Sequence, residues 1–491
     1  MVLYVRGDRT EKMILAKEHI YKISRKLLPF SDAESADFSL AQLLRLSLFQ
    51  ISVGMATVML AGTLNRVMIV ELGVPASLVA IMIAIPVLIA PLRTFFGFKS
   101  DTYKSVIGWR RIPYMWFGSI FQFGGLAIMP FSIIVLSGDQ TVGPSWAGEV
   151  LVAISFLFTG LGIHMTQTVG LALAADRATP ETRPRVVALL YFMFLFGMGI
   201  SALIIGALLA DFSKLRLIQV VQGAAVMTLV LNLVAVWRQE FIQKSVEVKD
   251  KEQKDSFLLT WKKFIEEKRI SSLIWVVFLG TMAFAMQDVL LEPYGGQILG
   301  LSVSATTLLT GLWAFGSLLG LAIAARKATR VKSPISNTMK ALLVGIVGFS
   351  AIIFSSPMQI PLLYFIGTTL IGFGTGLFSV SLLTLAMSFS SDDRVGRGLI
   401  LGSWGAAQAL GAGLGIAIGG ILRDIINQLA LSGVFGKTFE SDATGYLFVY
   451  HLEILIIFIT LISLGSLSQE LKKKQIDNNK ETRFGLAEIP S

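Results

Sequence analysis

Apolar stretches of about 20 residues recur along the chain and alternate with shorter polar segments. An α-helix needs about 20 consecutive apolar residues to cross the hydrocarbon core of a bilayer. The pattern therefore predicts twelve membrane-spanning helices. We expect them at residues 43–64, 76–96, 112–136, 147–174, 185–210, 216–237, 271–292, 304–325, 338–356, 360–388, 398–422 and 445–467.

The longest polar interruption, residues 238–270, is rich in lysine and divides the predicted spans into six and six. It predicts a cytoplasmic basic linker between an N-terminal six-helix bundle (43–237) and a C-terminal six-helix bundle (271–468). Residues 1–42 interleave leucine and isoleucine with lysine and arginine, which is typical of an amphipathic helix at the cytoplasmic membrane surface. A frayed soluble tail is the alternative there, and 469–491 is expected to be a cytoplasmic tail.

The distribution of basic residues predicts the orientation of the spans. Cytoplasmic loops of membrane proteins carry an excess of lysine and arginine. With twelve spans, both termini and the even-numbered loops lie on one side. The odd-numbered loops contain few basic residues, namely Arg66, Lys214, Arg216, Arg423 and Lys437. We therefore expect both termini in the cytoplasm.

Composition supports an all-α polytopic membrane protein. Hydrophobic residues make up 54% of the chain and charged residues 15%, against about 25% charged in soluble domains. A soluble core cannot absorb so much apolar sequence. Cysteine is absent and there are three histidines, which excludes a thiolate or multi-histidine metal site. The net charge of +10 indicates the orientation of the spans in the membrane and does not indicate nucleic-acid binding. Since no nucleophile pairs with a base in the sequence, we do not expect an enzyme.

The two predicted bundles resemble each other in sequence. Spans 2 and 8 are each followed by a basic loop, and spans 4 and 10 are followed by Asp176-Arg177 and Asp393-Arg394. Two six-span halves about a long central loop are the architecture of the major facilitator superfamily. The fold predicted is therefore that of this superfamily.

Polar residues inside predicted spans are costly in lipid and are functional candidates by default. Their spacing predicts polar stripes on spans 1, 4 and 7, which line the central cavity in the superfamily fold. The stripes comprise Gln50, Gly54, Thr57, Ala61 and Asn65; His164 and Gln167; and Thr281, Asp288 and Glu292. His164 could bind a metal, relay a proton or hydrogen-bond to a neighbouring helix. The alternative to a functional role for Asp288 and Glu292 is a solvated position near the outer membrane face.

Two local motifs have a structural interpretation. Gly97-x-x-x-Asp101 followed by Gly108-x-Arg110-Arg111 resembles the superfamily's cytoplasmic gate motif, with a longer spacer, and it either gates the cavity or anchors topology. The glycines of span 11 at spacing four (Gly411, Gly415, Gly419) predict close helix packing. Asp176, Arg183 and Arg185 are expected to make polar contacts between helices.

Five long strings resemble the PucC/LhaA family, an outlying branch of the superfamily in photosynthetic bacteria. They are GTLNRVMIVELG (62–73), GWRRIPYMW (108–116), QFGGLAIMP (122–130), RPRVVALLY (183–191) and LLEPYGG (290–296). The similarity runs from about residue 38 to residue 468. It implies a role in assembling light-harvesting complexes, with antenna polypeptides and the reaction-centre complex as partners besides membrane lipid. The implied location is the bacterial inner (intracytoplasmic photosynthetic) membrane or the thylakoid.

The resemblance also implies that the protein handles bacteriochlorophyll or chlorophyll. The magnesium of such a pigment needs an axial ligand, and His164, Gln167, Asn65 and Glu292 are the candidates. Gln50 and Asp288 are expected to be polar residues of the cavity. Two other functions stay open. One is a secondary transporter in which Asp288 or Glu292 carries a proton, and the other is a membrane chaperone that holds antenna helices and binds no pigment.

Overall fold

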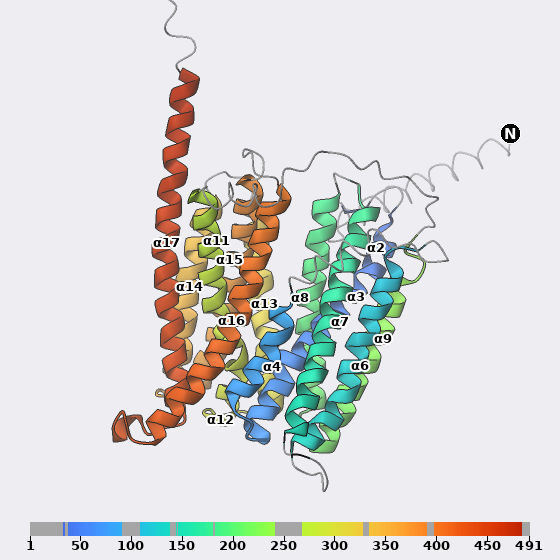
Figure 1. Ribbon diagram of the computed structural model, residues 1–491, viewed down its shortest axis with the longest axis vertical. Coiled ribbons are helices and arrows are strands. Elements are labelled where there is room, and N and C mark those ends of the chain that lie inside the picture. Colours follow the sequence, from blue (N-terminus) through green and yellow to red (C-terminus); the bar gives the residue numbers. More distant parts are fainter. Residues whose placement is uncertain are drawn as a thin grey trace, which may run out of the picture.

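The computed structural model of the protein describes residues 33–34, 38–90, 109–137, 144, 146–179, 182–240, 268–327, 333–389 and 397–483. These residues form a bundle of long helices that run roughly side by side (Figure 1). The N-terminal helices gather in one half of the bundle and the C-terminal helices in the other (Figure 1).

The N-terminal half begins with one continuous apolar segment, Leu40–Glu71, built from α2, α3 and two π-helical stretches. Ser39 caps α2 by a reciprocal hydrogen-bond pair with Gln42, so the segment starts at a defined residue. The elements of this half are α2 (Leu40–Leu46), α3 (Leu48–Thr57), η2 (Val58–Leu64), η3 (Val67–Glu71), α4 (Ala76–Leu88), α6 (Ile112–Leu136), α7 (Ala147–Arg177), α8 (Arg183–Leu208) and α9 (Lys214–Val236).

The C-terminal half contains six spans in which the first is interrupted and the last is extended. Its elements are α11 (Lys268–Ala285), η4 (Met286–Val289), α12 (Leu291–Gln297), α13 (Val303–Lys327), α14 (Ser333–Ser355), α15 (Pro361–Phe389), α16 (Arg397–Leu431), η5 (Lys437–Phe439) and α17 (Ala443–Arg483). α17 projects well beyond the rest of the bundle (Figure 1).

Eleven of the described helical segments are long and apolar enough to cross a membrane, and the shorter apolar helix α4 occupies the position of the second predicted span. The protein is therefore an all-α integral membrane protein, as predicted. The end of the bundle that holds the beginning of α2 and the projecting part of α17 is called the inner end below, and the opposite end is called the outer end.

Several predicted ends fall short of the observed ones. The first span continues from 64 to Glu71, and α16 continues from 422 to Leu431. Both extensions contain an arginine that the polarity pattern treats as a terminus, Arg66 and Arg423. Both arginines are buried and hydrogen-bonded inside the protein, so the helices continue past them. The predicted tail also proves helical as far as Arg483, where α17 ends.

Span 7 differs most from its prediction, since the single helix expected over 271–292 is broken. α11 ends at Ala285, a 3₁₀ turn follows, and α12 begins at Leu291. The predicted common face of Thr281, Asp288 and Glu292 is therefore wrong. Thr281 and Asp288 both line the central cavity, whereas Glu292 lies beyond the break against Thr310 of α13.

The halves meet along two helix pairs, α4 with α16 and α8 with α13. Within the C-terminal half, the predicted glycine face of span 11 packs against span 7. A Cβ at Gly411, Gly415 or Gly419 would lie 2.6 Å from a carbonyl oxygen of Phe278, Met282 or Met286 respectively. Only glycine permits this backbone approach, which confirms the close packing.

Candidate functional site

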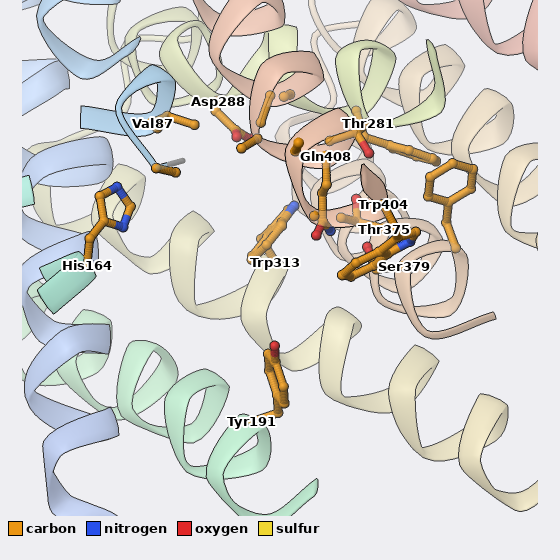
Figure 2. A pocket seen from close by; sticks show the side chains of 18 residues that line it. Val87, His164, Tyr191, Thr281, Asp288, Trp313, Thr375, Ser379, Trp404 and Gln408 are labelled. Carbon is orange, nitrogen blue, oxygen red and sulfur yellow. The ribbon is translucent and has the colours of Figure 1, made fainter. Parts of the chain in front are cut away.

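A cavity of about 590 Å³ lies between the two halves. Such a volume falls in the usual range for small-molecule sites. Its wall comes from α4, α7 and α8 on one side and from α11, η4, α13, α15 and α16 on the other (Figure 2). Five aromatic side chains contribute to it: Tyr191, Phe284, Trp313, Phe378 and Trp404.

Polar groups are spaced around this aromatic wall. His164 of α7 and Asp288 of η4 line it from opposite halves, and Gln408 lies on α16 (Figure 2). The indole N–H groups of Trp313 and Trp404 are buried and have no hydrogen-bond acceptor among the described residues. Buried donors without acceptors cost free energy, so these groups suit a ligand that brings carbonyl oxygens.

His164 makes the interhelical contact that was one of its three predicted roles. Its Nε2 lies 2.6 Å from the carbonyl oxygen of Pro86 on α4. At the end of α4 the N–H of Ala90 donates to Val87, one residue after Pro86, so the Pro86 carbonyl is open to a side chain. Of the four predicted pigment ligands, His164 is the one that lines the cavity, but this ring nitrogen is already engaged.

Gln50 and Gln167 pair with each other between α3 and α7. The amide of Gln167 donates to Oε1 of Gln50 over 3.4 Å, and Gln50 is fully buried. Neither residue is among those that line the cavity. Of the two residues expected to be polar groups of the cavity, Asp288 is there and Gln50 is in a helix interface.

Asn65 and Glu292 lie where spans 1 and 7 cross at the outer end. The Asn65 amide donates to the carbonyl oxygens of Ala61 and Val289, each over 3.1 Å. Glu292 accepts a hydrogen bond from Thr310, and its Oε2 has no partner among the described residues. Gly62 makes room for this carboxyl group, since a Cβ there would lie 2.6 Å from Oε1. Both residues therefore belong to the closure of the outer end.

A set of hydrogen-bonded polar residues, called the outer network below, completes this closure. Arg66 pairs with Glu71 over 2.5 Å and donates to the carbonyl oxygen of Leu301 in the other half. Arg423 pairs with Asp424 over 2.8 Å and donates to Gln297 over 2.8 Å. The network comprises Arg66, Glu71, Gln297, Arg423 and Asp424.

The outer network and its neighbours join the halves. The backbone N–H of Ser77 on α4 donates to Asp424 over 2.7 Å, and the Thr63 and Thr307 hydroxyls are 3.3 Å apart. Every hydrogen bond recorded between described residues of opposite halves involves a residue in 63–77 and lies at this end. The cavity is therefore closed toward the outer end.

The basic residues of the predicted gate motif form a second set, called the inner network, within the N-terminal half. Arg111 pairs with Asp176 of α7 over 3.0 Å, and Arg110 approaches the same carboxylate at 3.8 Å. The carboxylate of Glu240 accepts from the backbone N–H groups of Arg110, Arg111 and Ile112 at the start of α6, where the helix dipole favours a negative charge.

The remaining residues of this prediction are only partly described. Gly97, Asp101 and Gly108 lie outside the described residues, as does the side chain of Arg183. Asp176 does bridge α7 and α6, and Arg185 is exposed on α8. The gating role of the motif stays a prediction, since the described contacts of Arg110 and Arg111 stay within one half.

Sequence reasoning missed several buried polar residues. Glu453 of α17 is fully buried, and a group of four buried tyrosines (Tyr294, Tyr364, Tyr446, Tyr450) packs ring against ring with centroids 5.5–5.6 Å from Tyr294. A glutamate inside a strongly apolar span was the available signal for Glu453. For Arg66 and Arg423 the signal was their place in odd-numbered loops, against the positive-inside rule.

Two solved structures of similar fold are homologues of transporters. A bacterial homologue of the lysosomal transporter Spinster, inward-facing and unoccupied, matches with a TM-score of 0.65 at 14% identity over 90% of this chain and 99% of that one. A bacterial homologue of ferroportin in its inward-facing state matches with a TM-score of 0.60 at 18% identity over 88% and 99% of the chains. These likenesses identify the fold class, that of major facilitator superfamily transporters.

Sequence comparison then identifies the family. Residues 63–471 match the family described as PUCC protein, and the chain belongs to that family. It is 49% identical to Protein PucC of Rhodovulum sulfidophilum over 85% of this chain and 92% of that protein. It is 53% identical to the "Uncharacterized protein in puhA-bchM intergenic region" of Rhodobacter capsulatus over 98% of this chain and all of that protein.

A more distant relative has a name that suggests an enzyme. The "Bacteriochlorophyll synthase 44.5 kDa chain" of Rhodobacter capsulatus is 26% identical over 85% of this chain and 93% of that protein. The PUCC family and the transporter fold suggest a non-enzymatic membrane protein. The absence of catalysis stays a prediction.

Proposed function

We propose that the protein is an assembly factor for photosynthetic light-harvesting complexes. In this proposal it binds bacteriochlorophyll or chlorophyll as cargo in the central cavity and delivers it to antenna polypeptides in the membrane. Membership of the PUCC family and the pigment-related name of one relative support the setting. The observation that carries the pigment step is the aromatic-walled cavity with unpartnered donors between the two halves.

The residues of the cavity fit a flat, largely apolar pigment with polar substituents. Trp313, Trp404 and Tyr191 offer ring faces for a macrocycle, and the two indole N–H groups offer hydrogen bonds to its carbonyl oxygens. The pigment's magnesium takes an axial oxygen or nitrogen ligand. Asp288 and Gln408 present oxygen atoms on the cavity wall, whereas His164 gives its Nε2 to Pro86.

The first test is an absorption spectrum of the protein purified in detergent from a pigment-making host. We expect a red absorption band in near-stoichiometric amount that survives size exclusion and identifies the pigment. A colourless, well-folded protein would contradict the pigment step and leave the chaperone and transporter functions.

Substitution of Trp313 tests whether the pigment binds in the central cavity. Trp313→Ala removes a ring face and a donor from the cavity, so the pigment bound per protein should fall severalfold. Trp275→Ala is the matched control, because Trp275 is 58% exposed on the outside of the bundle, and it should leave pigment unchanged. Equal loss in both variants would argue against the cavity as the pigment site.

A His164→Ala variant tests the predicted ligand. If His164 ligates the magnesium, pigment content falls while the protein still accumulates in the membrane. If its role is the contact with Pro86, stability falls by about 1 kcal/mol and the pigment remains. Unchanged pigment content removes His164 from the set of ligands.

A secondary transporter is the second candidate, and the closure of the cavity at one end favours it. In that function the cavity opens alternately to the two sides and carries a small solute. Deletion of the gene tests the choice between the two functions. If antenna assembly is lost and only those variants of the protein that bind pigment restore it, the assembly factor is favoured.

The expected partners of the protein are antenna polypeptides and, as a further candidate, the reaction-centre complex. Both termini are expected in the cytoplasm.

A further inference from the structure

The carboxyl group of Glu453 lies on α17 beside the break in span 7. The side chain is fully buried, and neither oxygen makes a hydrogen bond of good geometry among the described residues, with the backbone N–H of Gln287 as its neighbouring donor. It faces the backbone of Gln287 in η4 and lies within electrostatic range of Asp288. A buried carboxyl group is therefore aimed at the point where the helix is interrupted.

Among the described residues, no cation interacts with Glu453. α17 packs against α11, α14, α16 and η4. Within the described part of the chain, Glu453 interacts electrostatically with Asp288 of η4 and with Tyr450 of its own helix, which belongs to the buried tyrosine group, and His451 two positions away is exposed. The charged residues of the packed helices lie near helix ends, apart from the exposed Lys340; they are Lys268, Arg269, Arg397, Arg423 and Asp424.

An ionised carboxylate in such a place would be strongly unfavourable. Burial of a charge without a partner costs far more than burial of a neutral polar group. Glu453 is therefore compatible with its observed position as the neutral acid, and the side chain holds a proton in this arrangement.

Asp288 connects this position with the cavity. It is partly exposed on the cavity wall and accepts a hydrogen bond from the Gln287 side chain (Figure 2). A proton leaving Glu453 thus has an acceptor next to it, and Asp288 in turn lines the cavity.

We propose that Glu453 and Asp288 form a proton-binding site at the break in span 7, and that occupancy of this site controls the closure of the outer end. Loss of the proton leaves a carboxylate on Glu453 while the proton passes through Asp288 to cavity water. The new negative charge repels Asp288 and separates η4 from α17. α12 follows directly, and its Gln297 belongs to the outer network, so this separation loosens the outer closure.

Because the chain contains no cysteine, paired spin labels can measure this closure in the full-length protein. Ala210→Cys on the N-terminal half and Ser441→Cys on the C-terminal half are exposed at the outer end. The labelled protein in lipid nanodiscs is frozen at pH values from about 5.5 to 8.5, and the distance between the two spin labels is measured by pulsed electron paramagnetic resonance. We expect a short distance at low pH and a longer one at high pH.

Variants at Glu453 test whether the pH-dependent change in distance comes from this residue. Glu453→Gln mimics the protonated acid and should hold the short distance at all pH values, whereas Glu453→Asp should keep a pH response. Glu149→Gln is the matched control, since Glu149 is exposed on α7 in the other half, and it should titrate like the parent. Glu453→Asp also serves if the Gln variant fails to accumulate.

Three results would overturn the proposal. A distance that does not change with pH, or a Glu453→Gln protein that titrates like the parent, shows that Glu453 does not control the closure. A change driven by sodium at constant pH assigns the site to a monovalent cation instead of a proton. The experiment needs no pigment, so its outcome is independent of the proposed function.

Discussion

The two ends of the bundle use arginine in opposite ways. At the inner end, Arg110 is one-third exposed and Arg111 pairs with a carboxylate that is 41% exposed, all within one half. At the outer end, Arg66 and Arg423 are buried. Arg66 donates to Leu301 of the other half, and Arg423 pairs with Asp424, whose carboxylate accepts from Ser77 of the other half. The many basic residues of a membrane protein set its topology, whereas the few on the opposite side take structural roles.

The largest expected effect comes from breaking the outer network. Arg66→Ala leaves Glu71 and the Leu301 carbonyl without their donor and removes a buried cation that joins the halves. We expect a loss of about 3 kcal/mol in unfolding free energy, because removal of one partner of a buried ion pair leaves the other charge desolvated and unpaired. Thermal unfolding of the purified protein measures it. Stability equal to that of the parent would show that the outer closure does not depend on this arginine.

A smaller effect is expected at the glycine contact between α16 and α11. Gly415→Ala places a Cβ 2.6 Å from the Met282 carbonyl oxygen, so the helices must separate. Such overpacking costs about 1–3 kcal/mol. Gly223→Ala on α9 is the control, since nothing lies within 4 Å of its Cβ position, and alanine there should be neutral or slightly stabilising. Similar losses in both variants would contradict the packing argument.

The smallest effect should come from the inner network. Arg110→Ala removes a partly exposed pair with a distance of 3.8 Å and should cost less than about 1 kcal/mol, because solvent screens such charges. The same thermal measurement checks it. A loss as large as that of Arg66→Ala would abolish the difference between the two ends.

The sequence was sufficient for the number, order and class of the spans, because hydrophobic length alone decides them. It failed where polarity inside a span has a partner in another span. Arg66 and Arg423 were assigned to loops, but each is buried and donates to a residue more than a hundred positions away. No local pattern contains the distant partners, Leu301 and Gln297.

The candidate site was harder to predict for a related reason. Spacing put Asp288 and Glu292 on one helix face, and the 3₁₀ turn Met286–Val289 separates them. The residues that give the cavity its aromatic wall, such as Trp313 and Trp404, lie in spans 8 and 11 and look like ordinary apolar positions. Their unpartnered N–H groups become visible only once the helices are packed.

The glycine contact between α16 and α11 has a mechanical consequence. Since three carbonyl oxygens of span 7 lie against bare Cα positions of α16, even a methyl group cannot be placed between the two helices there without moving them apart. α16 also carries Arg423 and Asp424 at its outer end. Because the bonds of these two residues lie at one end of one helix, a displacement of α16 there would strain the contacts with Gln297 and with Ser77 together.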